Sequence, residues 1–401
     1  MNILSLIVEY NPLHNGHVYH IKKSKEVTKA NYVIAIMSGN FVQRGIPSII
    51  DKWSRTKMAI LSGIDLVIEL PVIYAVSTAE KFAYGAIKLL DSLNIVDYVS
   101  FGSENGSIED LYNIAKFLVE EPEQYKLFLK EQLRLGITFA KAREIALNRF
   151  LGPKISKIIK DPNNILGVEY LKSLIRLKSN IKPITIKRYG PGYNSTETVN
   201  SFASANYLRK NIINKSFSVL NNFMPKYSTD ILEYCISNGF GPVTLDNFSS
   251  IIIYLLRNNY NLNSVFDITE GLQNRIYMAS RNCGNISELI KNIKSKRYTE
   301  SRIRRILLHV LLGINSKLYT SYDGPNYIRV LGFNKKGLEL MKMIKAKSTL
   351  PLITKVSNYK KILNDSLMFE RDLFATDIYS LSFKKSSNAG LDFTREIIML
   401  K

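Results

Sequence analysis

The sequence predicts an α/β fold, in which a parallel sheet carries helices on both faces and is followed by a mainly α-helical second part. Two observations support this prediction. Between residues 2 and 103, short apolar runs alternate with segments of helical periodicity, which is typical of βαβ units in a doubly wound sheet. After about residue 215, strand-like patterns fade and amphipathic helical patterns dominate.

The individual elements follow from apolar runs, turn residues and spacing. We expect helices over residues 17–29, 53–62 and 79–93, and a largely helical stretch over 105–180. Ligands of such sheets bind at the carboxyl ends of the strands, where residues 9–17, 38–40 and 101–104 lie. The expected strands are residues 2–8, 32–39, 65–70, 96–103 and 181–190.

The domain boundary is expected near residues 208–217. The first domain would then span 1–212, with a helical insertion at about 105–180, and the second would span 213–401.

Apolar residues make up 46% of the chain and charged residues 22%, as in ordinary globular proteins. No apolar run is long enough for a membrane span, no signal peptide is evident, and we expect a cytoplasmic protein without a membrane partner.

The two cysteines, Cys235 and Cys283, have no metal-ligand or redox-motif neighbour, so we expect reduced thiols and no disulfide partner.

The net charge of +21 is unevenly distributed. Residues 1–150 hold 17 Lys and Arg against 16 Asp and Glu, whereas residues 151–401 hold 38 against 18. A polyanion-binding second part explains this better than a generally basic surface. The 23 Tyr and 18 Phe fit RNA, because aromatic faces stack on unpaired bases.

Three of the four histidines, His14, His17 and His20, lie just after the first expected strand. The N-terminus of the following helix offers free N–H groups and a positive dipole end to phosphate. Gly16 lets a ligand approach the backbone, and imidazoles at His14 and His17 can face the same way. They would stabilise charge during attack on an α-phosphate. Two alternatives remain: a zinc site, or a structural turn with exposed histidines.

HNGH, residues 14–17, resembles the HxGH signature of the nucleotidylyltransferase superfamily. An ordered set of further motifs covers the whole chain and is similar to the bacterial tRNA(Met) cytidine acetate ligase family. These motifs are VEYNPLHNGHVYHI (8–21), IMSGNFVQRG (36–45), DKWSRTKMAI (51–60), DLVIELP (65–71), FGSE (101–104), PNNILGVEYLKSL (162–174), IKRYGPGYNS (186–195), FASANYLRK (202–210) and KSKRYTESRIRRIL (294–307).

The resemblance implies a Rossmann-like nucleotidylyltransferase domain that binds ATP, followed by a basic helical domain that binds tRNA. It implies a ligase that acetylates N4 of the wobble cytidine of elongator tRNA(Met), with acetate and ATP as substrates. An acetyl-adenylate would form, and AMP and diphosphate would be released. The partners would be ATP, Mg²⁺, acetate and the anticodon loop, with no tightly bound organic cofactor and no metal-ligand motif in the chain.

The resemblance also implies site residues. His14 and His17 would be catalytic. Residues 204–209 resemble the second signature of the superfamily, but Ala205 stands where that signature often has a hydroxyl. This departure weakens the case for serine contacts to phosphate more than the case for Arg209. The ATP site would comprise Ile7, Val8, Glu9, Tyr10, Asn11, Pro12, Leu13, His14, Asn15, Gly16, His17, Val18, Tyr19, His20, Gly102, Asn163, Arg188, Ser204 and Arg209.

Several of these residues have structural alternatives. Gly102 would suit a tight turn, Asn163 a helix cap, and Arg188 and Arg209 a basic surface. Asp51 and Arg55, one helical turn apart, would pair with each other. The densest basic segment, which we expect to bind tRNA unless it is a solvated helix, holds Lys291, Lys294, Lys296, Arg297, Arg302, Arg304 and Arg305.

Two other functions fit parts of the sequence. A small-molecule nucleotidylyltransferase would leave the basic second part unexplained. An RNA-binding protein that only senses ATP would not need histidines over the α-phosphate.

Overall fold

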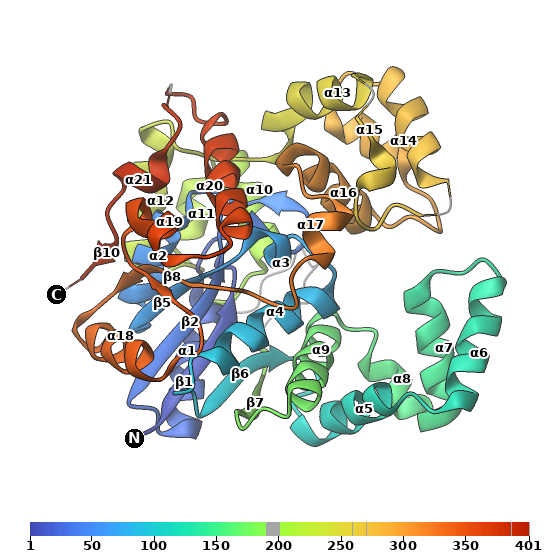
Figure 1. Ribbon diagram of the computed structural model, residues 1–401, viewed down its shortest axis with the longest axis horizontal. Helices are drawn as coiled ribbons and strands as arrows, with labels where there is room; N and C mark the ends of the chain where they lie inside the picture. Colours follow the sequence, from blue (N-terminus) through green and yellow to red (C-terminus); the bar gives the residue numbers. More distant parts are fainter. Residues whose placement is uncertain (190–200, 259, 270, 386, 401) are drawn as a thin grey trace.

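The structure is a computed structural model that describes residues 1–189, 201–258, 260–269, 271–385 and 387–400 (Figure 1). Its main sheet has eight strands in the order β10-β8-β5-β2-β1-β6-β7, with β9 paired to β8. The strands are β1 Ile3–Val8, β2 Tyr32–Ser38, β5 Leu66–Leu70, β6 Tyr98–Ser103, β7 Lys182–Lys187, β8 Ile328–Phe333, β9 Leu352–Ile353 and β10 Ile398–Met399. A separate hairpin pairs β3 Phe41–Val42 with β4 Ile46–Pro47.

The centre of the sheet is parallel, as the sequence predicts. β1 pairs in parallel with β2 and β6, β2 with β5, and β6 with β7. β8 runs antiparallel to β5, which makes the sheet mixed at one edge. These four pairings bring the carboxyl ends of five strands to one edge, where the predicted ligand segments lie.

Helices cover both faces because alternate strand residues point to opposite sides. Ile3, Ile34 and Ile68 pack into one apolar cluster with α4 and α9, whereas Leu4, Val33 and Val67 pack into another with α1, α2 and α10. In the first half of the chain the helices are α1 Asn15–Thr28, α2 Lys52–Leu61, α3 Val72–Ala75, α4 Ala79–Ser92, α5 Ile108–Glu120, α6 Glu123–Arg134, α7 Phe139–Leu151, α8 Pro153–Ile158 and α9 Pro162–Leu177.

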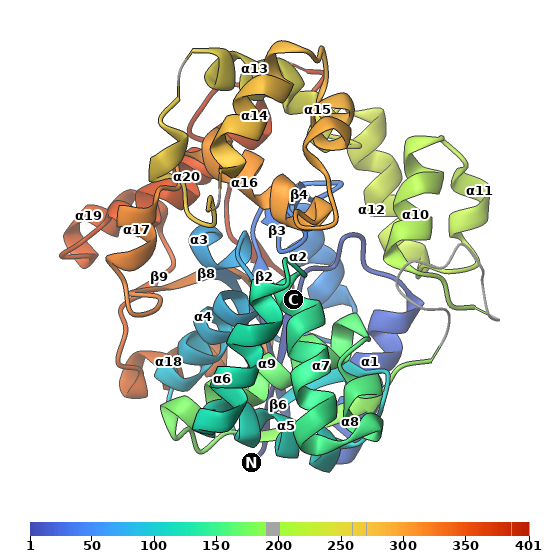
Figure 2. The same ribbon diagram turned by 90° about the vertical axis from the view of Figure 1, so that its right-hand side faces the viewer.

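The second half of the chain is mainly helical. Helices α13 to α16 form a lobe of their own, and α6 and α7 project from the body as a pair (Figures 1 and 2). The helices are α10 Ala205–Ile213, α11 Phe217–Leu220, α12 Lys226–Ser237, α13 Ser249–Arg257, α14 Leu272–Arg281, α15 Ile286–Ile293, α16 Glu300–Leu312, α17 Ser316–Thr320, α18 Lys335–Lys347, α19 Tyr359–Ile362, α20 Leu367–Ser380 and α21 Leu391–Thr394.

The predicted, mainly helical second part is confirmed, but it also contains three strands that the sequence analysis did not predict, β8, β9 and β10. All three belong to the main sheet, so the last part of the chain returns to the first. The physical reason is visible in β8, whose apolar run is interrupted by the buried Arg329. The division at residues 212 and 213 remains a prediction, and the sheet itself continues past it.

Two further features concern the described residues. No helix in that part of the chain combines the length and the apolar character that crossing a bilayer requires. Cys235 and Cys283 are both buried and are not bonded to each other.

Candidate active site

A cavity of about 360 Å³ opens at the carboxyl ends of β1 and β6, within the usual size range of ligand sites. The structure brings most of the residues predicted for ATP to its wall, from elements far apart in the sequence. Those that line it are Ile7, Val8, Glu9, Tyr10, Asn11, His14, His17, His20, Gly102, Asn163, Arg188, Ser204 and Arg209. Gly16 and Tyr19 line a smaller adjoining hollow. Pro12, Leu13, Asn15 and Val18 line neither and belong to the supporting loop and first helix.

The loop after β1 is held in place by a buried guanidinium. Arg55 on α2 donates hydrogen bonds to the backbone carbonyls of Glu9, Ser38 and Gly39, and so joins the ends of β1 and β2. The expected pairing of Asp51 with Arg55 was wrong. Asp51 instead caps α2, and its Oδ1 accepts a hydrogen bond of 2.9 Å from the backbone N–H of Ser54.

His14 and His17 form a reciprocal cap at the N-terminus of α1. Nδ1 of His14 accepts a hydrogen bond of 3.1 Å from the backbone N–H of Gly16. Nδ1 of His17 accepts one of 3.3 Å from the backbone N–H of His14. The two rings stack, with their centroids 3.8 Å apart. An imidazole nitrogen that accepts a hydrogen bond carries no proton. Because Nδ1 is the acceptor in both histidines, the proton of each neutral ring lies on Nε2.

The protonation of these rings follows from their surroundings. Burial lowers the pKa of His14 to about 3, helped by the positive charges of Arg188 and Arg209. Burial also lowers the pKa of His17, with His14 and Arg188 acting in the same direction. At neutral pH both imidazoles are therefore neutral and offer an Nε2–H donor. Such donors suit phosphate oxygens without the desolvation cost of two buried cations.

His20 has a different role, because it connects α1 to the sheet. Its Nε2 lies 3.1 Å from the hydroxyl of Ser100 on β6, which in turn contacts Ser24. His20 thus ties α1 to the neighbouring strand at the floor of the cavity. The zinc alternative does not fit this arrangement, because one nitrogen of each histidine already has a partner and the three side chains do not form a group that could hold a metal ion. Among the described residues, no group of three or more His, Cys, Asp or Glu side chains could hold a metal ion.

Positive groups stand on the other walls. Arg188 follows β7, and a Cβ at Gly102 would lie 3.3 Å from its Cγ, so the glycine leaves room for the arginine. Gly102 lies within β6 and closes no turn, which removes that alternative. Arg209 on α10 donates a 2.8 Å hydrogen bond to the carbonyl of Asn11. Ser204 caps α10, and its hydroxyl accepts a hydrogen bond from the backbone N–H of Tyr207.

Asn163 joins the loop after β6 to the start of α9. Its Nδ2 donates a 2.6 Å hydrogen bond to Glu104, whose other oxygen accepts from the backbone N–H of Asn164. The capping alternative was wrong, because the cap position of α9 is Asp161. Residues 190–195 of the IKRYGPGYNS motif lie outside the described residues.

Several residues line the cavity without a sequence signal that predicts it. Gln43 and Arg44 come from the β3–β4 hairpin, Phe82 from α4 and Tyr170 from α9. Gln43 and Arg44 belong to the IMSGNFVQRG motif, whose resemblance implies no role for either residue. Phe82 and Tyr170 look like ordinary core residues in the sequence, and only the fold shows that they border the cavity.

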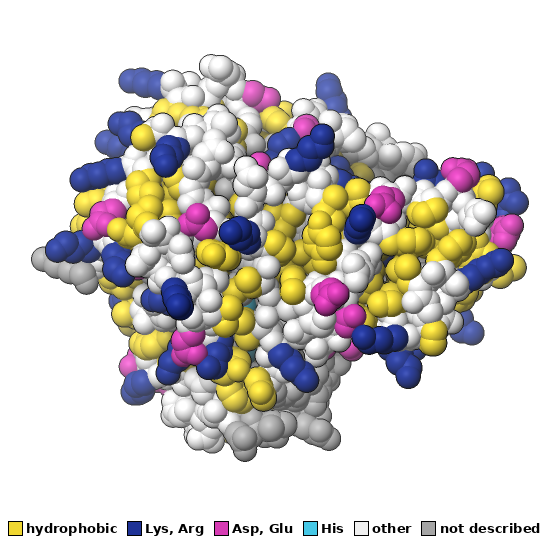
Figure 3. Space-filling view, turned by 90° about the horizontal axis from the view of Figure 1, so that it is seen from below, with side chains coloured by type: hydrophobic (Ala, Val, Ile, Leu, Met, Phe, Trp, Pro, Cys, Tyr) yellow, Lys and Arg dark blue, Asp and Glu magenta, His cyan; other side chains and the backbone are white. Residues whose placement is uncertain are grey.

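The residues predicted to bind tRNA lie on or near α15 and α16, and several of them have acidic neighbours. Arg302 and Arg305 share a helix face, as expected, and both contact Asp267. Lys294 and Arg304 pair with Glu300. Lys291, Lys296 and Arg297 are exposed. Figure 3 views the molecule from below Figure 1, away from α15 and α16, and on that face Lys and Arg side chains are dispersed among apolar and acidic ones.

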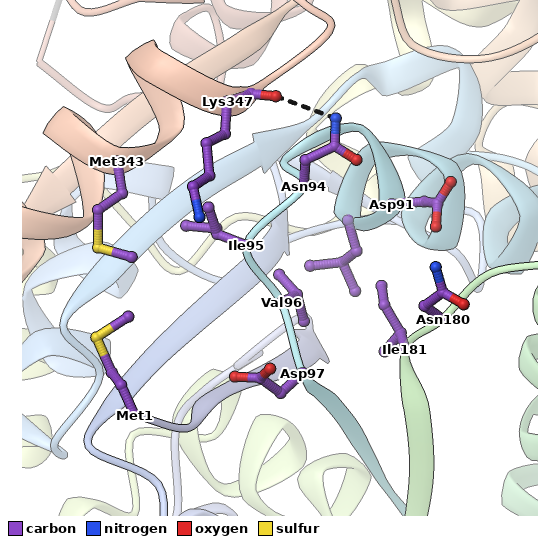
Figure 4. A pocket seen from close by; sticks show the side chains of 11 residues that line it. Met1, Asp91, Asn94, Ile95, Val96, Asp97, Asn180, Ile181, Met343 and Lys347 are labelled. Carbon is purple, nitrogen blue, oxygen red and sulfur yellow. Dashed lines mark hydrogen bonds between the residues drawn. The ribbon is translucent and has the colours of Figure 1, made fainter.

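A second cavity of about 300 Å³ lies at the opposite, amino ends of the strands (Figure 4). Its carboxylates already have partners, since Asp97 accepts from the backbone N–H of Ile3 and Asp91 from the hydroxyl of Ser179. Asn94 donates to the carbonyl of Lys347 across it. These contacts join α4 and α18 to the sheet. We interpret the cavity as a gap between packed structural elements and not as a ligand site.

Comparison with known proteins gives consistent results. The model of the HIGH Nucleotidyl Transferase family matches residues 1–392. A tRNA(Met) cytidine acetate ligase of Thermoanaerobacter sp. (strain X514) is 58% identical over 401 residues, which cover 100% of both chains. The enzyme of the same name from Acetivibrio thermocellus is 45% identical, again over 100% of both chains.

Two solved structures match the whole fold. The crystal structure of Thermotoga maritima TmcAL without ligand has a TM-score of 0.95 at 37% identity and covers 100% of both chains. The same protein bound with alpha-thio ATP has a TM-score of 0.93 at 36% identity, with the same coverage.

Proposed function

Because this chain belongs to the HIGH nucleotidyl transferase family and to the tRNA(Met) cytidine acetate ligase family, we propose that it acetylates N4 of the wobble cytidine of elongator tRNA(Met). It is a ligase. Acetate would attack the α-phosphate of ATP, forming an acetyl-adenylate and releasing diphosphate. The cytidine amine would then attack the acetyl carbon and release AMP. Since tRNA is the substrate, the enzyme would act in the cytoplasm.

The reciprocal cap of His14 and His17 supports this proposal most directly. It fixes two neutral rings with Nε2–H donors in the cavity that Arg188 and Arg209 also line. Attack by one anion on another needs positive or donor groups that are already in place. The rings and the two guanidinium groups provide them, while the N-terminus of α1 adds its dipole.

Mg²⁺ would add positive charge on the phosphates. The described residues form no cluster of three or more metal ligands, so Mg²⁺ would be held mainly by phosphate oxygens and water. The chain's own contribution is to orient the nucleotide. Gly102 and Asn163 would border the adenosine, and Arg209 with the α10 N-terminus would face the outer phosphates.

The second step needs an activated acyl group. The lone pair of the cytidine amine is delocalised into the ring, so the amine is a weak nucleophile, and AMP is a good leaving group that makes acylation feasible. The anticodon loop can present an unpaired base to the cavity. The exposed Lys291, Lys296 and Arg297 would contact tRNA phosphates. Such contacts fix the position of the tRNA on the protein and carry no sequence information.

The test is ATP–diphosphate exchange by the purified protein without RNA, with and without acetate. Exchange that requires acetate would support the acetyl-adenylate. Exchange that does not require acetate would point to another acid or to a small-molecule nucleotidylyltransferase. Absence of exchange with any acid, together with retained ATP binding, would favour the ATP-sensing RNA-binding alternative.

A further inference from the structure

Glu9 is the first residue after β1, and its carboxylate lines the same cavity as His14 and His17. Its Oε1 accepts a hydrogen bond of 2.7 Å from the backbone N–H of Gln43. Within the described part of the chain, no residue makes a hydrogen bond or ion pair to its Oε2. One oxygen therefore anchors the β3–β4 hairpin, and the other is available to a ligand.

Glu9 belongs to the loop that the resemblance assigns to ATP, and its carboxylate is held by the β3–β4 hairpin. Gly102 and Asn163, which the resemblance assigns to ATP, lie at the β6 side. The lining of the cavity also includes Gln43 and Arg44 of the hairpin and two buried aromatic residues, Phe82 of α4 and Tyr170 of α9.

The hairpin side of the cavity adjoins the segment predicted to bind tRNA. The β3–β4 hairpin that carries Gln43 and Arg44 packs against α16. The approach is close, because a Cβ at Gly45 would lie 2.5 Å from the backbone nitrogen of Arg305. A tRNA held along α15 and α16 would therefore reach the cavity at the Glu9 side.

Burial raises the pKa of Glu9, and Gln43, Arg44, Arg209 and Arg55 act in the opposite direction. The other titratable groups nearby are Tyr170, His14 and His17. A carboxylate whose pKa is raised by burial is a stronger base than an exposed one.

We propose that Glu9 accepts the proton of the cytidine N4 amino group during acetyl transfer, an inference that rests on the proposed function. In this step the bond between N4 and the acetyl carbon forms, and the bond from that carbon to the oxygen of AMP breaks. AMP leaves with the electron pair, and one N4 proton passes to Oε2 of Glu9 and then to solvent. Carboxylates are natural acceptors for the cytosine amine.

Glu9→Gln is the informative variant. The glutamine carbonyl oxygen can still accept from the N–H of Gln43, so the hairpin keeps its anchor, while the proton acceptor is lost. Two rates are measured in each protein: acetate-dependent ATP–diphosphate exchange, and single-turnover acetylation of tRNA(Met) from preformed acetyl-adenylate. Glu26→Gln, on the exposed side of α1 where Glu26 pairs with Lys23, is the matched control.

We expect transfer to fall by about 100-fold or more in Glu9→Gln, in line with the loss of a general base, and exchange to fall much less. The control should match the wild type in both rates. A transfer rate close to wild type would mean that Glu9 only anchors the hairpin, and equal losses in both rates would mean that it shapes the ATP loop. Either result would overturn the proposal. If the wild type itself shows no acetate-dependent exchange, the proposed function fails instead.

Discussion

His14 caps the helix on which His17 stands, and His17 in turn accepts a hydrogen bond from the backbone N–H of His14. Each ring thus uses Nδ1 for the backbone and keeps Nε2 for the cavity. Helix capping and ligand binding are carried out by different atoms of the same side chain. This separation means that the two roles can be tested independently.

His14→Asn should keep the cap and lose the ligand donor. The Asn side-chain oxygen can accept from the N–H of Gly16, as Asn does at helix caps, but it presents no group at the position of Nε2. We expect acetate-dependent exchange to fall by about 100- to 1,000-fold, typical for loss of one donor to a developing charge. Urea unfolding should show little change in the free energy of unfolding.

His14→Ala provides the comparison for that variant. It removes both the cap and the donor, so we expect the same loss of exchange and an additional destabilisation of about 1 kcal/mol. If His14→Asn exchanges at the wild-type rate, the Nε2–H of His14 has no part in catalysis.

The buried histidines should make stability depend on pH. Burial lowers the pKa of His14 to about 3 and that of His309 to about 4, whereas an unfolded histidine titrates near 6.5. Below about pH 6.5 the unfolded state therefore binds more protons than the folded state, and the free energy of unfolding falls as the pH falls. We expect a loss on the order of 1 kcal/mol per pH unit for each such histidine.

The measurement is urea unfolding at several pH values between about 7.5 and 4.5, followed by the same series for His309→Gln. In the folded protein the ring of His309 bonds the carbonyl of Val76 at 2.7 Å, a contact that the glutamine amide can replace. The slope against pH should become shallower in the variant. An unchanged slope would contradict the burial of a neutral His309.

A buried ionic cluster joins the last part of the chain to the sheet. Lys52 lies 3.0 Å from Glu69 and 2.9 Å from Asp392, and Arg329 lies 3.0 Å from Glu69 and also binds Asp392. Arg329→Leu would leave two carboxylates with only one cation, so we expect a loss of about 3–5 kcal/mol in the free energy of unfolding. Lys23→Leu, which breaks an exposed pair with Glu26, should change it by less than about 1 kcal/mol.

Arg329 also explains why the sequence predicts the first part of the fold better than the last. The runs 2–8 and 32–39 contain no charged residue, and 65–70 keeps four apolar residues around Glu69; strands lie within all three. β8 places a charge in the middle of a short run, and only its partners on distant segments make that burial possible. β9 and β10 have two residues each, too few for any periodic pattern.

The same distinction holds for the site. The histidine cluster is local in sequence, so its place at a strand end and helix start was predictable. The role of Glu104 in binding Asn163, and that of Arg55 in joining two loops, depend on contacts across long stretches of chain. No local pattern indicates such contacts.

Gly45→Ala should weaken the packing of the β3–β4 hairpin on α16. Gly45 has a φ of +75°, and an added Cβ would lie 2.5 Å from the backbone nitrogen of Arg305. Gly136 is a close control, because its φ is +74° and an added Cβ would meet no atom within 4 Å. We expect Gly45→Ala to lower the free energy of unfolding by about 1–3 kcal/mol more than Gly136→Ala. Equal effects would mean that backbone strain alone matters.

The segment predicted to bind tRNA should divide into two kinds of residue. Lys291 and Lys296 are exposed, so replacing either with Ala should weaken tRNA binding and lower the dependence of log K on log salt by about one unit. Lys23, exposed on α1 and outside this segment, is the control and should leave both quantities unchanged.

Arg305 should behave differently from these lysines. Its guanidinium is largely buried and lies 3.9 Å from Asp267, which Arg302 also contacts. Replacing Arg305 with Ala should therefore lower the free energy of unfolding and leave the salt dependence of tRNA binding nearly unchanged. The reason is that the residue supports α16 and presents little charge to solvent. Filter binding across a salt series, paired with urea unfolding, separates the two effects. If Arg305→Ala changes the salt dependence as much as Lys296→Ala without loss of stability, its guanidinium contacts tRNA, and the pairing with Asp267 is exchanged on binding.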